Sequence, residues 1–495
     1  MVGAIRGQAP FKPGVGMRQR ISDPYKAFLA TKQPKTLACG PAKVRAFPGA
    51  LKPFQTDIVT WAVRMGRAAI FASTGLGKTL QQLSWAQAIG RHASGKVLIL
   101  TPLAVAQQTV QEAKKFGIDG VAYARDQAHA MSDIVVTNYD RVEKFDMAEF
   151  AAIVLDESSI IKAHDSKTRA LLMDLCVDIP YRLCCTATPA PNDYVELGNH
   201  AEFLGVCTAK EMLATWFVHD GSIRATNAAN HGSKPIAEWR LKGHAENDFW
   251  RWVSTWAVMI RHPRDLGYED VGYDLPPLHK HQITVDVDYV SAQQSGMLFA
   301  IEAKTLQERR AASRSSIQAR VDAAARIVAE APDRPWLIWC QLNDEADALK
   351  SALPNAIEVR GPDDPELKAE RLLGFANGAI DCLISKPSIA GWGMNFQRCS
   401  DMIFVGLNDS FEQLYQAIRR CWRFGQTRPV NVYMIAAETE GAVVTNLDDK
   451  ERAAEYMAAQ MAEHMKDLTR RSLRGDDRAP VARDASKMRV PAWLT

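Results

Sequence analysis

The stretch Ala72-Ser73-Thr74-Gly75-Leu76-Gly77-Lys78-Thr79 decides the fold class of this chain. It follows the apolar run 69–72, which predicts a strand, and precedes 80–86, whose apolar spacing predicts a helix. A strand, a glycine turn and a helix N-terminus form an anion site, because backbone N–H groups and the helix dipole converge there. Gly75 and Gly77 leave room for phosphate oxygens, Lys78 would reach the β- and γ-phosphates, and the Thr79 hydroxyl would ligate Mg²⁺. The alternative is a chance match in a glycine-rich turn. Motifs elsewhere in the chain are therefore needed to distinguish a phosphate loop from such a turn.

A second apolar run, 151–155, ends in the acidic pair Asp156-Glu157. Standing alone, such a pair is usually a solvated strand end. Beside a phosphate loop the interpretation changes, because an aspartate at a strand tip holds Mg²⁺ through water and a neighbouring glutamate polarises the attacking water. We therefore assign Asp156 to the metal and Glu157 to the base.

Cations that could act on the same phosphate lie far downstream, in the segment 416–426. If this segment is helical, Arg420 and Arg423 are three residues apart and share one face. They would then stabilise charge that develops during phosphoryl transfer. The alternative is a basic helix surface for nucleic acid, which would also use Arg419, but Gly425 favours a helix end over a long basic stripe.

With these three sites in this order, the chain resembles the Swi/Snf-like branch of the superfamily 2 helicase-type ATPases. The resemblance covers about residues 50–436. The matching segments are 52–55 (Lys-Pro-Phe-Gln), 101–103, 136–139, 156–162, 186–193, Ser385, 390–396 and 416–426. One departure is Ser159, which stands where the family usually has a histidine; a serine hydroxyl can still hydrogen-bond but cannot be cationic.

The resemblance implies a role for each matching residue, with ATP as substrate and Mg²⁺ as cofactor. The residues that would bind ATP are Gln55 (at the adenine edge), Thr74, Gly75, Gly77, Lys78, Thr79 and Gly393. Those that would couple hydrolysis to movement are Thr186, Thr188 and Gln416. Those that would contact nucleic acid are Thr101, Pro102, Asn138, Ser385 and Asn395.

Strand and helix patterns alternate along the chain. The predicted strands are 68–72, 96–101, 133–138, 151–156 and 181–186, then 336–341, 381–385, 401–406 and 430–436, with helices such as 78–91 and 103–116 between them. Such alternation predicts parallel sheets covered by helices, with ligands bound at the carboxyl ends of the strands. We expect an α/β protein of two tandem RecA-like lobes, each a parallel sheet flanked by helices, with the nucleotide in the cleft between them.

The expected lobes are 47–275 and 276–440, preceded by a basic N-terminal arm (1–46) and followed by a helical extension and tail (441–495). We expect an exposed loop over 220–247, a long charged helix over 291–331 and a helix over 449–473. Tryptophans near 250 could form a base-stacking platform. The interpretation we prefer is core packing, with Trp252 and Trp256 on one helix face.

Composition is ordinary for a globular protein, with 24% charged residues and a net charge of +3. The basic residues concentrate in 1–46, which carries nine of them against one acidic residue; this arm either contacts phosphates or is a solvated tail. Nine cysteines without a Cys-x-x-Cys pair predict neither a zinc cluster nor a disulfide framework. With no apolar run of about 20 residues, we expect no membrane contact and a cytoplasmic protein of a bacterium or phage-infected cell.

The sequence thus predicts a DNA-dependent ATPase that translocates along mostly double-stranded DNA. Two alternatives stay open at this point. One is a helicase that separates DNA or RNA strands, and the other is a nucleotide-gated clamp on nucleic acid with little turnover. The sequence does not identify protein partners.

Overall fold

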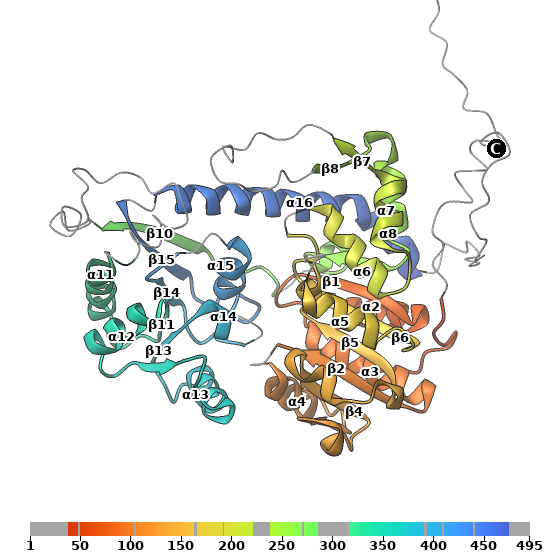
Figure 1. Cartoon of the computed structure of the whole chain (residues 1–495), viewed down its shortest axis with the longest axis horizontal. Coiled ribbons are helices and arrows are strands. Elements are labelled where there is room, and N and C mark those ends of the chain that lie inside the picture. Colours follow the sequence, from red (N-terminus) through yellow and green to blue (C-terminus); the bar gives the residue numbers. More distant parts are fainter. Residues whose placement is uncertain are drawn as a thin grey trace, which may run out of the picture. The chain divides into compact units, whose positions relative to one another are not determined.

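The computed structural model describes residues 38–474, except 48–49, 103–104, 163–165, 192, 221–237, 270–271, 286–313, 315, 391–393, 408–409 and 439–440. Two parallel sheets organise this part of the chain (Figure 1). None of its helices is both long and apolar enough to cross a bilayer.

The first sheet has seven parallel strands in the order β3-β4-β2-β5-β6-β1-β9. They are β1 (Arg67–Ala72), β2 (Lys96–Thr101), β3 (Val121–Tyr123), β4 (Ile134–Asn138), β5 (Phe150–Asp156), β6 (Tyr181–Thr186) and β9 (Ala257–Ile260). A parallel sheet is buried on both faces, so its strands are apolar throughout rather than alternating. Every residue of β4 is buried accordingly.

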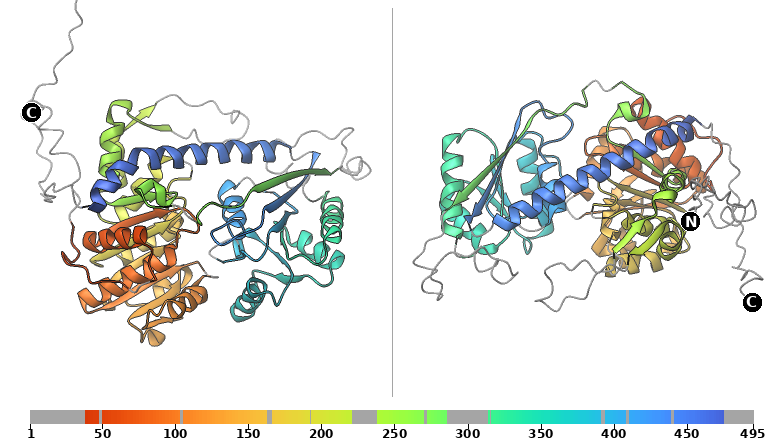
Figure 2. Two further views of the ribbon diagram at one scale, coloured as in Figure 1. Left: turned by 180° about the vertical axis from the view of Figure 1, so that it is seen from behind. Right: turned by 90° about the horizontal axis from the view of Figure 1, so that it is seen from above.

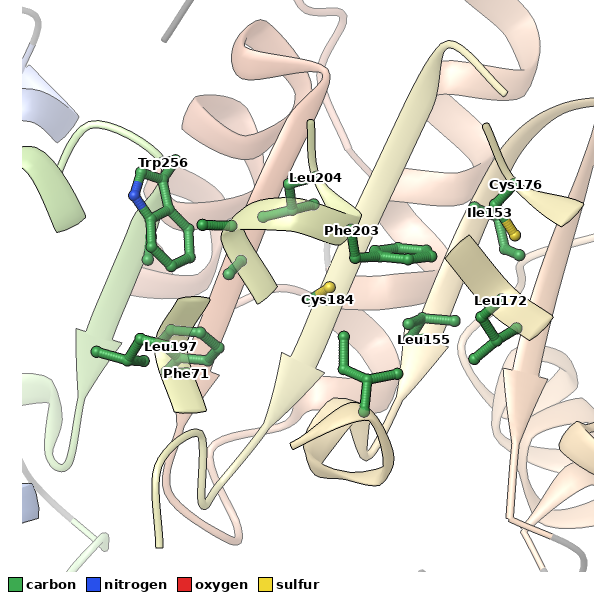
Figure 3. Packing of buried hydrophobic residues seen from close by; sticks show 14 of the residues in the cluster. Phe71, Ile153, Leu155, Leu172, Cys176, Cys184, Leu197, Phe203, Leu204 and Trp256 are labelled. Carbon is green, nitrogen blue, oxygen red and sulfur yellow. The ribbon is translucent and has the colours of Figure 1, made fainter. Parts of the chain in front are cut away.

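Neighbouring residues of each strand enter different hydrophobic clusters, because successive side chains point to opposite faces. Ala68 and Ile70 pack under α2 (Pro53–Met65), α3 (Lys78–Ala93) and α4 (Ala106–Lys115). Ala69 and Phe71 pack on the other face, which is covered by α5 (Lys167–Leu175), α6 (Leu197–Phe203), α7 (Ala209–Trp216) and α8 (Glu246–Val253). Figure 3 shows this second face, where Phe203 and Leu197 of α6 lie over the strands.

The second sheet has six parallel strands in the order β10-β15-β14-β11-β13-β12. They are β10 (Leu278–Val285), β11 (Trp336–Trp339), β12 (Ile357–Val359), β13 (Cys382–Ser385), β14 (Asp401–Phe404) and β15 (Val430–Ala437). One face packs on α11 (Ile317–Glu330) and α12 (Asn343–Ala352), and the other on α13 (Pro365–Asn377), α14 (Pro387–Ala390) and α15 (Phe411–Ile418).

A 34-residue helix, α16 (Gly441–Arg474), follows the second sheet and is continuous (Figure 2, blue). Val443 and Leu447 belong to a core cluster of the second sheet, whereas Met461 and Met465 belong to one of the first sheet. A separate antiparallel pair, β7 (Phe217–Asp220) and β8 (Glu238–Leu241), precedes α8.

The predicted fold class is confirmed, since two helix-flanked parallel sheets follow one another along the chain. The sequence pattern missed β9, which is only four residues long, and β10, whose exposed Lys280 and two histidines hide its strand character. The loop over 220–247 is wrong at β8 and α8, while 221–237 lie outside the described residues.

Three further expectations concern helices. The core interpretation of the tryptophans is confirmed, because Trp252 and Trp256 are buried and their rings meet edge to face at 5.4 Å. Their placement on one helix face is wrong, since α8 ends at Val253. The helix over 449–473 lies within α16, and α11 forms part of the one expected over 291–331, of which 286–313 and 315 fall outside the described residues.

Candidate nucleotide site

The turn between β1 and α3 requires glycine at two positions. Gly75 and Gly77 have φ of 93° and 76°, the left-handed region that disfavours side chains. A Cβ on Gly77 would lie 2.4 Å from Gln55 Nε2, and one on Gly75 would lie 2.8 Å from the backbone nitrogen of Phe424. The 16-residue helix α3 then begins at Lys78, so its first N–H groups lack intrahelical acceptors and offer a site for an anion.

A cavity of about 390 Å³ opens beside this turn. Its lining includes Gln55, Thr74, Gly75, Gly77, Lys78, Thr79, Asp156, Glu157, Asn395, Arg420 and Arg423. The structure therefore brings together the three sequence motifs that predicted phosphate chemistry, although the arginines follow the second sheet's α15. Thr74 and Gly75 also line a second cavity of about 340 Å³, which contains neither Lys78 nor the acidic pair.

Lys78 is held inside the turn that it follows. Its Nζ donates to the Ala72 carbonyl oxygen at 2.9 Å. Burial lowers the pKa of Lys78, while the charges of Glu157 and Asp156 act in the opposite direction. The ammonium group thus stands at the cavity wall close to two carboxylates.

Asp156 ends β5, Glu157 follows it, and both are buried, with each residue 7% exposed. Burial, together with the charge of Glu157, raises the pKa of Asp156. Gln82 opposes this shift because its Nε2 donates to Asp156 Oδ1 at 2.6 Å. The sequence reasoning missed Gln82, although it stands four residues after Lys78 on α3 and therefore shares its helix face.

Glu157 has a left-handed backbone with φ of 55°. Its Oε2 accepts a hydrogen bond from Thr186 Oγ1 at 3.2 Å, and Thr186 Oγ1 in turn accepts from the Thr188 backbone N–H at 3.1 Å. Two of the residues expected to couple hydrolysis to movement thus form a chain that starts at the expected base. Ser159 takes no part in it, because its buried Oγ has no hydrogen-bond partner in the described structure.

The helical placement of the two arginines is wrong. Helix α15 ends at Ile418, so Arg420 and Arg423 lie in the turns that follow it. Their side chains meet at a shared acceptor and not on a helix face. Both donate to the Met394 carbonyl oxygen, at 3.4 and 3.3 Å, and the Phe396 N–H donates to the Arg420 carbonyl oxygen at 2.9 Å.

Gln416 fixes the direction of Arg420. Arg420 Nε donates to the Gln416 carbonyl oxygen and Nη2 donates to Gln416 Oε1, both at 2.8 Å. Burial lowers the pKa of Arg420 to about 10, which leaves the guanidinium charged at neutral pH. Arg420 is only 2% exposed, and Arg419 stacks on Trp422 and Tyr415. This geometry does not form the exposed basic stripe of the alternative interpretation.

Comparison with protein families decides the relationship. The SNF2-related domain matches residues 54–318, more than half of the chain, and the helicase conserved C-terminal domain matches residues 319–425. The chain belongs to the SNF2-related family.

Curated relatives of this SNF2-related chain share low identity with it. A Bacillus subtilis protein named uncharacterized ATP-dependent helicase YqhH is 22% identical over 78% of this chain and 75% of its own length. The TATA-binding protein-associated factor mot1 of Schizosaccharomyces pombe is 33% identical over 20% of this chain and 6% of its own. The chromatin-remodeling ATPase INO80 of Drosophila melanogaster is 27% identical over 39% of this chain and 14% of its own length. The chain therefore matches only a small part of the mot1 and INO80 lengths.

A solved structure titled "Sulfolobus solfataricus SWI2/SNF2 ATPase core in complex with dsDNA" aligns with 87% of this chain and 98% of that one. The identity is 18% and the TM-score is 0.39.

The amide of Gln55 is engaged with the phosphate loop of the SNF2-related domain. Its Nε2 donates to the Leu76 carbonyl oxygen at 2.9 Å and its Oε1 accepts from the Lys52 N–H at 2.8 Å. Gln55 also lines the cavity, and these two bonds use two of the four hydrogen-bonding positions of its amide. Gly393, also expected at ATP, lies outside the described residues.

The residues expected at nucleic acid are not gathered on one surface. Thr101, Asn138 and Ser385 end β2, β4 and β13, and these residues are 0%, 2% and 1% exposed. Pro102 follows Thr101 and is half-buried, whereas Asn395 lines the nucleotide cavity.

The donor set suits Mg²⁺. The described residues contain no cluster of three or more His, Cys, Asp or Glu that would enclose a metal. The cavity instead offers the Thr79 hydroxyl and the Asp156 carboxylate, with Glu157 adjacent. Mg²⁺ is typically held by one or two carboxylates, by waters and by phosphates of the substrate, so this sparse oxygen set fits it.

Proposed function

We propose that this chain is a DNA-dependent ATPase that couples ATP hydrolysis to translocation along double-stranded DNA. One observation carries the proposal: Lys78 of α3 and the pair Asp156-Glu157 at the end of β5 line the same cavity as Arg420 and Arg423, which follow α15 beside the second sheet. A nucleotide bound there would touch both lobes. ATP, ADP and the empty state would then favour different lobe arrangements, because a ligand shifts a conformational equilibrium through its differential contacts.

Each residue of the cavity has a separate task in this mechanism. Lys78 and the N-terminus of α3 bind the β- and γ-phosphates, and Gln55 orients the base. Thr79 and Asp156 would hold Mg²⁺, which would supply positive charge to the phosphates when bound. Glu157, fixed by Thr186, accepts a proton from the water that attacks the γ-phosphate, and the products are ADP and inorganic phosphate.

The two arginines act on the charge of the transferring phosphoryl group. Arg420 and Arg423 come from the second lobe, which we place at 276–440, whereas the phosphate loop belongs to the first, at 47–275. Contacts from another lobe make hydrolysis depend on how the lobes are arranged. DNA that favours the productive arrangement would therefore stimulate turnover.

DNA contacts are proposed at the carboxyl ends of the strands. Because Thr101, Asn138 and Ser385 are themselves buried, the residues that follow them along the chain, such as Pro102, would meet the phosphates. Asn395 would link such a contact to the nucleotide cavity. Phosphate contacts carry no sequence information, which suits movement along any sequence. The Bacillus subtilis relative, which is named as an ATP-dependent helicase, supports nucleic acid as the partner.

The cysteines support a cytoplasmic location. All nine are unpaired, and seven of them are buried. Disulfides form and persist in oxidising compartments and are rare in the cytosol. Free thiols throughout the two lobes therefore suit a reducing environment.

The test measures ATP turnover with increasing duplex DNA, single-stranded DNA or RNA. Duplex DNA should stimulate hydrolysis most, and Lys78→Ala should abolish it without unfolding the protein. Lys96→Ala is the control, because Lys96 forms an ion pair with Glu149 at the start of β2 and lies away from the cavity. Near-normal hydrolysis by folded Lys78→Ala would end the proposal.

Two further assays separate the alternatives. ATP-driven displacement of a triplex-forming strand from intact duplex indicates translocation, whereas melting of a forked duplex indicates a strand-separating helicase. ATP-dependent DNA binding without release of phosphate would indicate a clamp.

A further inference from the structure

Glu157 holds a backbone conformation that needs support. Among the described residues, only Glu157 and Ser94 have a positive φ without being glycine, at 55° and 51°. A side chain in this region persists only where the surrounding structure over-determines it. The contacts around the residues that follow Glu157 should therefore include those that set the direction of its carboxylate.

Side chains of helix α6 form hydrogen bonds with both ends of the segment 158–162, which follows Glu157. Ser158 Oγ lies 3.1 Å from His200 Nε2 in a hydrogen bond. Four residues further on, the Lys162 carbonyl oxygen accepts from Asn199 Nδ2 at 2.5 Å. Asn199 is itself fixed, because its Oδ1 accepts from Arg169 Nε at 3.0 Å. Two adjacent side chains of one helix thus hold the turn 158–161 in place.

His200 also touches the strand that leads into the phosphate loop. It is fully buried, and its ring meets Phe71 of β1 edge to face at 5.2 Å. Phe71 lies one residue before Ala72, whose carbonyl oxygen accepts from Lys78. Burial lowers the pKa of His200 to about 4, so its imidazole is neutral near pH 7 and acts through hydrogen bonding and shape.

We propose that His200 is a positioning residue of the ATPase reaction, which holds Ser158 and thereby aims the Glu157 carboxylate at the attacking water. The inference rests on the proposed function, in which Glu157 is the base. His200 touches no reacting atom. Its contribution passes through one hydrogen bond to the residue that directly follows the base, so it should appear in turnover and not in ATP binding.

A histidine that only fills the core would behave differently. Its replacement would lower thermal stability. Turnover would then fall in proportion to stability in every variant, whether or not the new side chain carries a polar group. The two roles are separated by variants of similar size. His200→Gln can place a polar atom near Nε2, His200→Asn places one nearer Nδ1, and His200→Leu has no polar group.

The experiment measures kcat and KM for ATP with saturating DNA, ATP affinity under conditions without turnover, and Tm. His200→Leu and His200→Asn should lower kcat about 3- to 10-fold, the range expected for one hydrogen bond. KM and ATP affinity should change less than about twofold, because an interaction used only in the transition state affects kcat. His200→Gln should recover most of the rate.

Ser158→Ala tests the same bond from its other end. It should lower kcat about as much as His200→Leu, and the double variant should be no slower than the slower single variant, because both changes remove one interaction. If His200→Leu does not fold, Ser158→Ala and the comparison of His200→Gln with His200→Asn decide the question.

Three results would overturn the inference: kcat of His200→Leu within about twofold of the wild type, equal losses in the Gln, Asn and Leu variants, or independent effects in the double variant. Failure of the proposed function has a different signature. In that case the wild-type chain itself shows no turnover that Lys78→Ala abolishes.

Discussion

Gln82→Met should weaken Mg²⁺ binding at the site while the fold survives. Gln82 is fully buried and gives Asp156 a hydrogen bond of 2.6 Å, whereas its own Oε1 has no partner in the described structure. Methionine keeps the length of the side chain and removes both the bond and the unpaired acceptor. A hydrogen bond to a charged group is worth about 1.5–3 kcal/mol, and loss of a ligand's supporting partner typically costs 10–100-fold in metal affinity or activity. We therefore expect the Mg²⁺ concentration for half-maximal ATP turnover to rise about 10- to 100-fold.

The neighbouring residue provides a matched control. Gln81 is also fully buried and also has an unpaired Oε1, but its Nε2 donates to the Leu76 carbonyl oxygen at 2.9 Å and not to a carboxylate. Mg²⁺ titrations of steady-state hydrolysis should shift for Gln82→Met and remain near the wild-type curve for Gln81→Met. Equal shifts in both variants would assign the effect to the phosphate-loop turn. An unshifted Gln82→Met would refute the role of Gln82 in orienting Asp156.

Glu157→Gln should keep ATP binding and lower turnover about 100- to 10,000-fold, because the amide keeps the shape and loses the base; lost ATP binding would make Glu157 structural. Arg423→Ala, and more weakly Arg420→Ala, should lower the DNA-stimulated rate, by about 1,000-fold or more for Arg423. Loss of DNA affinity with unchanged residual ATPase would contradict this. Deleting 1–46, with nine basic residues against one acidic, should weaken DNA binding and make the slope of log affinity against log salt concentration less steep by about 0.9 for each phosphate that the arm neutralises; an unchanged slope would give the arm another role. Burial depresses the pKa of His200 from 6.5 to about 4, so stability present above about pH 6.5 is lost as the pH falls toward 4, by about 3 kcal/mol in total. Urea unfolding at about pH 7 and about pH 4.5 should therefore show a smaller difference for folded His200→Leu than for the wild type; equal differences would show that His200 does not cause the loss.

The parts of the site that the sequence predicted are those encoded in consecutive residues. Gly75, Gly77 and Lys78 are recognisable because a strand, a turn and a helix N-terminus follow one another within a few residues. Asp156 and Glu157 are recognisable because they end an apolar run. In each case the backbone alone brings the groups to the carboxyl edge of the sheet, and no distant contact is needed.

The arginine segment shows where local pattern fails. Its spacing suits a helix face, but α15 stops at Ile418 and the chain turns. The turn is stabilised from outside the segment, by the Phe396 N–H on the Arg420 carbonyl oxygen and by the Met394 carbonyl oxygen between both guanidiniums. Both partners precede Arg420 by more than twenty residues, so the pattern within 416–426 alone does not contain them.

The contacts that support the acidic pair also come from residues that are distant in the sequence. Gln82 reaches Asp156 across 74 residues of sequence, His200 reaches Ser158 across 42, and Thr186 reaches Glu157 across 29. Each supporting residue comes from a different element, namely α3, α6 and the end of β6. Since these elements pack on or within one sheet, a change in any of them can alter the direction of the two carboxylates without touching the nucleotide. A motif match can therefore identify which residues perform the chemistry, while the rate depends on buried glutamine, histidine and threonine side chains whose partners only the folded chain defines.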